Sequence, residues 1–318
     1  MVAAAKKAVA LREKIQTNLR SNGLQLFQGG DFQLDGTITC PARYQAGAVR
    51  ADRPTILRQG PPGSGPMFRL PGADMQFSGQ LYLYGNGVDP IIEVEGNTDL
   101  TTGWHKFTDL KFLKCPKGGA FKALKGHYEY NAKTGRTGKF IEDEMHADNC
   151  TIRDCHFYGQ DYSIVTLDNQ QALNWQIIRG SANAISADGK DWGDIIAFEC
   201  VRGGMMQAHG MILNCPRFTW LKTHGMNPNT NVLVVRDFFR DLPTTKNQYL
   251  RLFDDSLVCA DDPAKREWAE NWRAGLWQLR INGWVPGELD RSQFFTTERP
   301  IYNRDLSQID ITPLGAAA

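Results

Sequence analysis

The chain has 318 residues, 42% of them hydrophobic and 22% charged, with 36 basic and 35 acidic side chains and a formal net charge of +1. This length and apolar content suffice for one large core, as in a globular protein. The balanced charge provides no global positive field, so we expect no nucleic-acid partner. No run of about 18 apolar residues is present, so we also expect no membrane span.

The first predicted element is a helix within residues 1–23. Val9, Ile15 and Leu19 fall near one face, and an Asn-Gly pair supplies a stop at its end. Charged side chains interrupt its apolar residues, so we expect no secretion signal. We interpret the helix as an N-terminal cap or anchor.

Short strand-like phrases recur along the next part of the chain. Each alternates apolar and polar residues, turns at a polar corner and continues as a second short apolar pair. "NCTIRDCHFYG" begins at Asn149 and "NVLVVRDFFRD" at Asn231. Similar phrases begin at Met75, His105, Leu173, Asp194 and Gly210.

A stacked coil of roughly 20 to 25 residues, made of two or three short strands, accounts for this recurrence. The intervening segments show too little helical periodicity to supply crossover helices, which disfavours a doubly wound α/β fold. We therefore predict an all-β protein, a right-handed parallel β-helix solenoid over residues 24–256 with an N-terminal capping α-helix.

Seven cysteines, an odd number, lie mostly within these phrases. We interpret them as small buried hydrophobes in a protein assembled in a reducing cytosol. The Gly/Pro segment "RQGPPGSGP" lacks the Gly-Lys-Ser/Thr of a P-loop, so we interpret it as a surface corner.

Residues 116–148 are long, basic at first and broken by glycines, which predicts an inserted loop or hairpin that leaves the stack. Loops on a rigid scaffold commonly carry binding residues. The candidates for a contact surface here are Tyr128, Tyr130, Lys133 and Arg136.

The pattern changes again over residues 257–318, where we predict a mixed C-terminal cap. Trp268, Trp272 and Trp277 stand near helical spacing after an Asp-Pro start, so a closing helix is expected, followed by an extended tail.

The helix, the entry segment "GGDFQLDGTITCP" and ladders such as "NCTIRDCHFYG" together resemble the right-handed β-helix superfamily. That superfamily includes pectate lyases, polygalacturonases and bacteriophage tailspikes, and the resemblance covers roughly residues 24–255. The resemblance implies a right-handed parallel β-helix fold. The acid-base motif of polygalacturonases appears only as fragments in the wrong order, so it assigns no catalytic residue.

Glycoside cleavage requires two carboxylates at close range, and stacked coils bring equivalent positions to about 5 Å. The candidates are Asp154, Asp161, Asp168, Asp188, Asp191 and Asp194. The alternative, which we favour, is that they are corner residues whose carboxylates bond the local backbone.

Two histidines, His209 and His224, are further acid-base candidates. No metal-ligand spacing accompanies them, so we expect no metal and no cofactor. Trp175, Trp192 and Trp220 stand one near each of three successive coils. They could form a stacking track for a sugar chain or equally belong to the core.

These observations favour a non-catalytic bacteriophage virion protein, tailspike-like, receptor-binding or capsid-decorating. By resemblance we expect a homotrimer that contacts other virion proteins and a cell-surface polysaccharide, assembled in the host cytoplasm. One alternative is a polysaccharide lyase or glycoside hydrolase acting on a host-envelope, plant or algal polysaccharide. The other is an extracellular, non-catalytic carbohydrate-binding surface protein.

Overall fold

The computed structural model describes the chain in a series of segments. They are residues 2–41, 47–95, 102–126, 128–131, 136–140, 147–169, 172, 174–184, 193–200, 204–215, 217–223, 231–236, 239–240, 249–254, 276–284 and 309–313.

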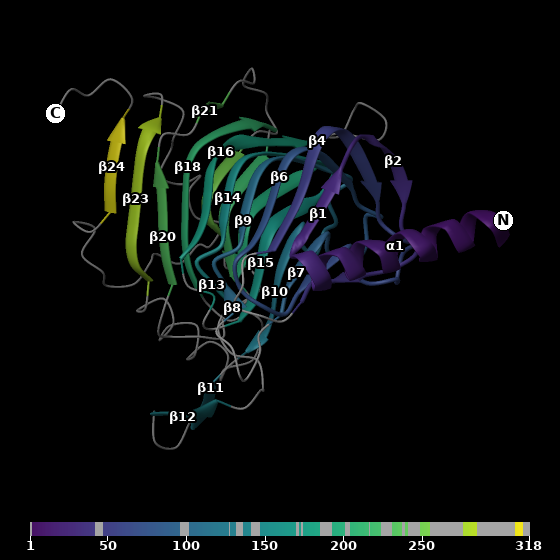
Figure 1. The fold of residues 1–318 in the computed structure, drawn as a ribbon. Coiled ribbons are helices and arrows are strands. Elements are labelled where there is room, and N and C mark those ends of the chain that lie inside the picture. Colours follow the sequence, from purple (N-terminus) through teal and green to yellow (C-terminus); the bar gives the residue numbers. More distant parts are fainter. Residues whose placement is uncertain are drawn as a thin grey trace.

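Two large parallel sheets and a single long helix, α1 (Val2–Asn22), make up most of the described structure (Figure 1). The first sheet has twelve strands in the order β1-β4-β6-β9-β14-β16-β18-β20-β23-β24, with β2 beside β4 and β21 beside β18. The second has eight strands in the order β22-β19-β17-β15-β10-β7-β5-β3. The predicted all-β fold with parallel strands is confirmed.

The strands of the first sheet are β1 (Leu24–Phe27), β2 (Gly30–Gln33), β4 (Gly47–Arg58), β6 (Met75–Tyr84), β9 (Lys106–Leu113), β14 (Thr151–Gly159), β16 (Trp175–Ala184), β18 (Gly204–Asn214), β20 (Asn231–Arg236), β21 (Phe239–Arg240), β23 (Leu276–Trp284) and β24 (Ile309–Pro313). Those of the second are β3 (Ile38–Thr39), β5 (Phe68–Leu70), β7 (Ile92–Val94), β10 (Phe121–Gly126), β15 (Tyr162–Asn169), β17 (Asp194–Cys200), β19 (Arg217–Thr223) and β22 (Tyr249–Asp254). A small parallel pair joins β8 (Thr102–Gly103) to β13 (Ala147–Asp148).

From β14 to β19 the chain alternates between the two sheets, one strand in each. Partners on neighbouring strands are therefore far apart in sequence: Asn149 and Asn174 are separated by 25 residues, and Asn183 and Asn214 by 31. The first spacing lies within the predicted repeat of 20 to 25 residues, and the second exceeds it. Successive phrases, such as those of β16 and β17, belong to different sheets.

Strands of the first sheet bend near their middle. Asp109, Asp154 and Arg179 follow paired residues on β9, β14 and β16, and each has a positive φ of 51 to 56°. Gly79 and Gly210 have positive φ at the matching places on β6 and β18. This conformation is costly for most residues, so its repetition across neighbouring strands fixes one bend line.

The core lies between the sheets and is rich in phenylalanine. Phe77 stacks on Phe107 with ring centroids 5.1 Å apart, and Phe112 stacks on Phe157 at 4.9 Å. Phe121 from the second sheet meets Phe107 edge-on at 4.7 Å, so aromatic contacts join the two sheets.

All described cysteines are free and buried, as predicted. Burial raises the pKa of the Cys115 and Cys155 thiols to about 12, because an apolar interior disfavours the thiolate. These thiols are core residues.

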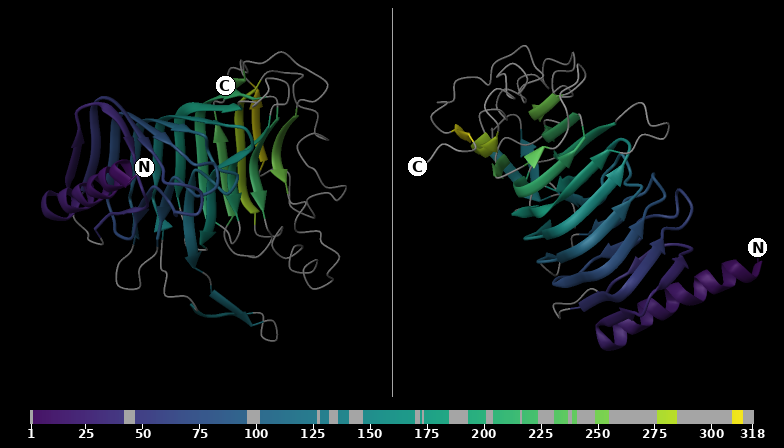
Figure 2. Two further views of the ribbon diagram at one scale, coloured as in Figure 1. Left: turned by 90° about the vertical axis from the view of Figure 1, so that its right-hand side faces the viewer. Right: turned by 90° about the horizontal axis from the view of Figure 1, so that it is seen from above.

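Helix α1 lies across one end of the two sheets, against β1 and β3 (Figure 2). Ile15 and Leu19 are fully buried there. Gly23 has a φ of 65° and its N–H donates to the Leu19 carbonyl at 3.1 Å, which ends the helix at the predicted stop.

The predicted insertion over residues 116–148 is wrong in its first part, because Phe121–Gly126 forms β10 within the second sheet. Later residues form an antiparallel hairpin, β11 (Tyr128–Asn131) with β12 (Arg136–Phe140), set apart from both sheets (Figure 1). Tyr128 and Tyr130 lie on one strand and Arg136 on the other, while Lys133 lies outside the described residues.

The helix predicted around the C-terminal tryptophans is wrong at Trp277, which lies in strand β23. In β23, Leu279 and Ile281 are in register with Leu233 and Val235 of β20. The first sheet thus continues past residue 256. Trp268 and Trp272 lie outside the described residues.

Candidate functional site

Asp154, the first carboxylate candidate, lies on the bend line of the first sheet. Its Oδ2 accepts a hydrogen bond from Nη2 of Arg179 at 2.7 Å, across to the next strand. The ion pair is more than a third exposed, so it contributes little to stability by itself. The ion pair joins two residues of neighbouring strands that both have a positive φ.

Asp161 and Asp194 are brought together at a corner. Asp161 Oδ1 accepts the backbone N–H of Asp194 at 2.7 Å, and Asp194 Oδ1 pairs with Nε of Arg217 at 2.8 Å. The predicted bonds to the local backbone are therefore wrong for this pair: Asp194 lies 33 residues after Asp161, and the two carboxylates connect the starts of the neighbouring strands β15, β17 and β19. Asp168 lies in β15 and is partly buried.

Several candidates lie outside the described residues, namely Asp188, Asp191, Trp192 and His224. His209 lies on β18, half-buried, in register with Ile178 of β16 and Arg236 of β20.

Of the two alternatives for the tryptophans, a stacking track or core residues, the two described members are core residues. Trp175 and Trp220 are fully buried. Nε1 of Trp175 donates to the Ala147 carbonyl at 2.7 Å, and Trp220 meets Phe218 edge-on at 4.8 Å. Both rings are core residues and cannot stack on a ligand at the surface.

Polar side chains on the outer side of the first sheet bond from strand to strand. Asn174 donates to Oδ1 of Asn149 at 2.8 Å. Further along the strands, Nδ1 of His156 lies 2.9 Å from Oγ of Ser181, which also accepts from Nδ2 of Asn183 at 2.8 Å. Such a ladder satisfies these polar groups and holds the register of the strands.

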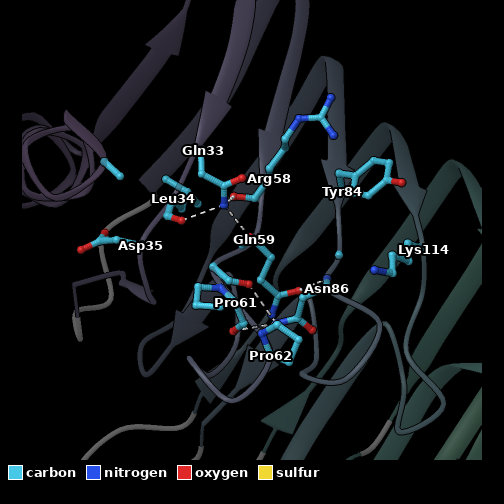
Figure 3. Close-up of a pocket in the computed structure, with 13 residues that line it drawn as sticks. Gln33, Leu34, Asp35, Arg58, Gln59, Pro61, Pro62, Tyr84, Asn86 and Lys114 are labelled. Atoms are coloured by element: carbon cyan, nitrogen blue, oxygen red, sulfur yellow. Dashed lines mark hydrogen bonds between the residues drawn. The ribbon is translucent and has the colours of Figure 1, made fainter. Parts of the chain in front are cut away.

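A groove of about 580 Å³ opens where β2, β4 and β6 end (Figure 3). Gln33, Arg58 and Tyr84 are the last residues of these strands and stand in register. The remaining lining residues are Ala8, Leu34, Asp35, Gln59, Gly60, Pro61, Pro62, Gly85, Asn86 and Lys114.

The floor of the groove is held by two amide side chains. Gln59 is buried; its Nε2 donates to the carbonyls of Gly65 and Pro90, both at 2.9 Å, and its Oε1 accepts the N–H of Asn86 at 3.1 Å. Nδ2 of Asn86 donates to the Gly60 carbonyl at 3.1 Å. These bonds fix the corners, so the groove is preformed.

Cations and an aromatic ring form its rim. Arg58 bonds both carboxylate oxygens of Asp31, at 2.7 and 2.8 Å, and this contact lowers the pKa of Asp31. The same guanidinium lies 4.9 Å from the centre of the Tyr84 ring. Lys114 is exposed, and within the described segments no carboxylate pairs with it.

The groove opens onto a broader surface, the outer side of the first sheet beyond its bend. We call this surface the tyrosine face. It consists of Ile56, Arg58, Tyr82, Tyr84, Lys111, Leu113, His156, Tyr158, Ser181, Asn183, Ile212 and Asn214.

Sequence reasoning missed this region because it selected residues by chemical type. The segment after Arg58 forms a corner, as predicted, but the sequence alone does not identify its neighbours across the sheet. The signal was present in "LYLYG", where Tyr82 and Tyr84 alternate with two leucines that are buried.

No family model, no curated protein and no solved structure matches the chain. Among the described residues, none of the helices is both long and apolar enough to cross a membrane. Those residues also include no group of three or more His, Cys, Asp or Glu side chains placed to hold a metal ion.

Proposed function

We propose that the two sheets wind into a right-handed parallel β-helix solenoid capped by α1, and that the protein is a structural component of a bacteriophage particle. It acts like a tailspike, as a receptor-binding or capsid-decorating element, without catalysing a reaction. Alternation of the chain between two parallel sheets supports the solenoid, since each pair of consecutive strands then adds one rung to both sheets.

The observation that carries the non-catalytic role is the set of contacts made by three candidate carboxylates, those of Asp154, Asp161 and Asp194. A hydrolytic pair needs two carboxyl groups that converge on one substrate bond. Asp154 instead pairs with Arg179 along the bend line, while Asp161 and Asp194 bond a backbone N–H and an arginine at a corner. Their contacts are those of a scaffold.

Free, buried thiols support assembly in a reducing compartment, as expected of a phage protein made in the host cytoplasm. The resemblance to tailspikes supports a homotrimer with closed cyclic symmetry that contacts other proteins of the particle. Stacked cores with bonded side-chain ladders also suit a stiff rod.

A depolymerisation assay tests the role. The full chain is incubated with a panel of host-envelope, plant and algal polysaccharides, and new chain ends are measured. We expect none above the buffer blank. Cleavage of any member would establish an enzyme and refute the structural role. Asp154→Asn and Asp161→Asn would then identify which carboxylate acts.

A further inference from the structure

We propose that the tyrosine face is a docking surface for a different protein whose contacting side is acidic. The inference rests on the proposed role as an assembly component, because it supplies that role with a partner. It assigns the contact to residues that sequence reasoning did not single out.

The composition of the face is that of a protein interface. On strands β4, β6, β9, β14, β16 and β18, half of its positions are aliphatic or tyrosine and none is a carboxylate; Asp31 of the edge strand β2 is in register with Ile56 and pairs with Arg58. Tyr84 and Ile212 are 37% and 43% exposed although both are large. Interface cores are enriched in tyrosine and arginine and depleted in aspartate and glutamate. Tyrosines also give contact area at low entropic cost, because they have few rotatable bonds.

The charges on and beside the face are positive and incompletely neutralised. Lys111 lies 4.8 Å from the centre of the Tyr82 ring, and its Nζ donates to the Tyr82 hydroxyl at 3.4 Å. Neither Lys111 nor Lys114 has a carboxylate partner in the part of the chain that the structure describes. Arg58 forms an ion pair with Asp31, which lies on the edge strand β2. Carboxylates of an acidic partner would neutralise these cations, since complementary surface potentials steer two proteins toward association.

The groove at the end of the face can receive an anchoring side chain. It is preformed by the Gln59 and Asn86 hydrogen bonds, and Tyr84 and Lys114 stand at its rim. Residues that bury in such pockets usually carry most of the binding energy. An aspartate or glutamate of the partner, placed beside Lys114, fits this position.

A second copy of the chain is a poorer fit than a different protein. The outer positions of the second sheet alternate in sign and pair internally: Arg69 bonds Glu93 at 2.7 Å, and Lys222 lies 3.9 Å from Glu199. In the described strands, that sheet therefore offers no uncompensated acidic row to meet the tyrosine face.

Binding of an acidic peptide to the full chain tests the proposal. The probe is a fluorescein-labelled decapeptide of alternating Asp and Leu, followed by anisotropy at low and high salt. We expect saturable binding that salt weakens. Lys111→Glu and Lys114→Glu should each raise the Kd about tenfold or more, whereas Lys122→Glu, the same charge change on the second sheet, should alter it less than about twofold.

Lys111→Gln gives a milder form of the same test, and thermal unfolding of every variant checks that the fold is intact. Absence of binding, or equal weakening by Lys122→Glu, overturns the proposal. Tighter binding of polygalacturonate than of the peptide assigns the face to a glycan and also overturns it. Loss of wild-type self-association in Lys111→Glu does so too, because the occupant is then a second copy. None of these outcomes depends on the depolymerisation assay.

Discussion

Acidification to about pH 5 will destabilise the protein by about 2 kcal/mol through His105 alone. The His105 side chain is fully buried, and its Nδ1 accepts the N–H of Met75 at 3.1 Å. Burial lowers its pKa to about 3, because the imidazolium would lose its water. In the unfolded chain the pKa returns to about 6.5.

The His105 imidazole therefore binds a proton at a higher pH in the unfolded state than in the folded state. The contribution is fully present above about pH 6.5 and is lost as the pH falls toward about 3, at about 1.4 kcal/mol for each pH unit. About 1.5 pH units below the unfolded value, this amounts to about 2 kcal/mol.

Guanidinium unfolding at about pH 7.5 and about pH 5 measures this effect in the wild type and in His105→Gln. Glutamine keeps an acceptor for the Met75 N–H but does not titrate. Carboxylates titrate alike in both proteins, so the difference between the two pH dependences isolates His105. Equal pH dependences would refute the assignment of a neutral, desolvated imidazole.

Three further predictions concern packing. Gly180→Ala places a Cβ against the Cys155 carbonyl at a φ of 142°, so it should lower stability by more than about 1 kcal/mol in thermal melts, whereas Gly118→Ala, which meets nothing, should not. Phe112→Ala should cost about 3 to 5 kcal/mol in denaturant unfolding, against less than about 0.5 kcal/mol for the exposed Val88→Ala; similar losses would contradict the stacked core. The six described cysteines should resist a thiol reagent until the protein unfolds, because all six side chains are buried; rapid labelling of several in the native protein would contradict this.

Parallel, strand-rich architecture could be predicted because the alternating phrases recur without helices between them. The buried cysteines followed from the same pattern. The orientation of Trp175 could not be predicted, because Ile177 and Ile178 are both apolar and leave the phase of the alternation open. The bend at Arg179 then changes, within the single strand β16, which side chains of the alternation point inward.

The groove was beyond sequence reasoning for a different reason. Gln33, Arg58 and Tyr84 are each separated by about 25 residues, and they meet only because parallel pairing places them in register. A period estimated from phrases that belong to two different sheets could not supply that register. Once the pairing is known, the alternation of outward side chains identifies the rest of the tyrosine face.

The mass of the full chain in solution, measured by light scattering, tests the account most directly. A tailspike-like assembly component predicts a homotrimer of about 107 kDa, three times the 35.7 kDa of one chain, that keeps its mass on dilution. A stable monomer of 35.7 kDa at all concentrations would contradict it.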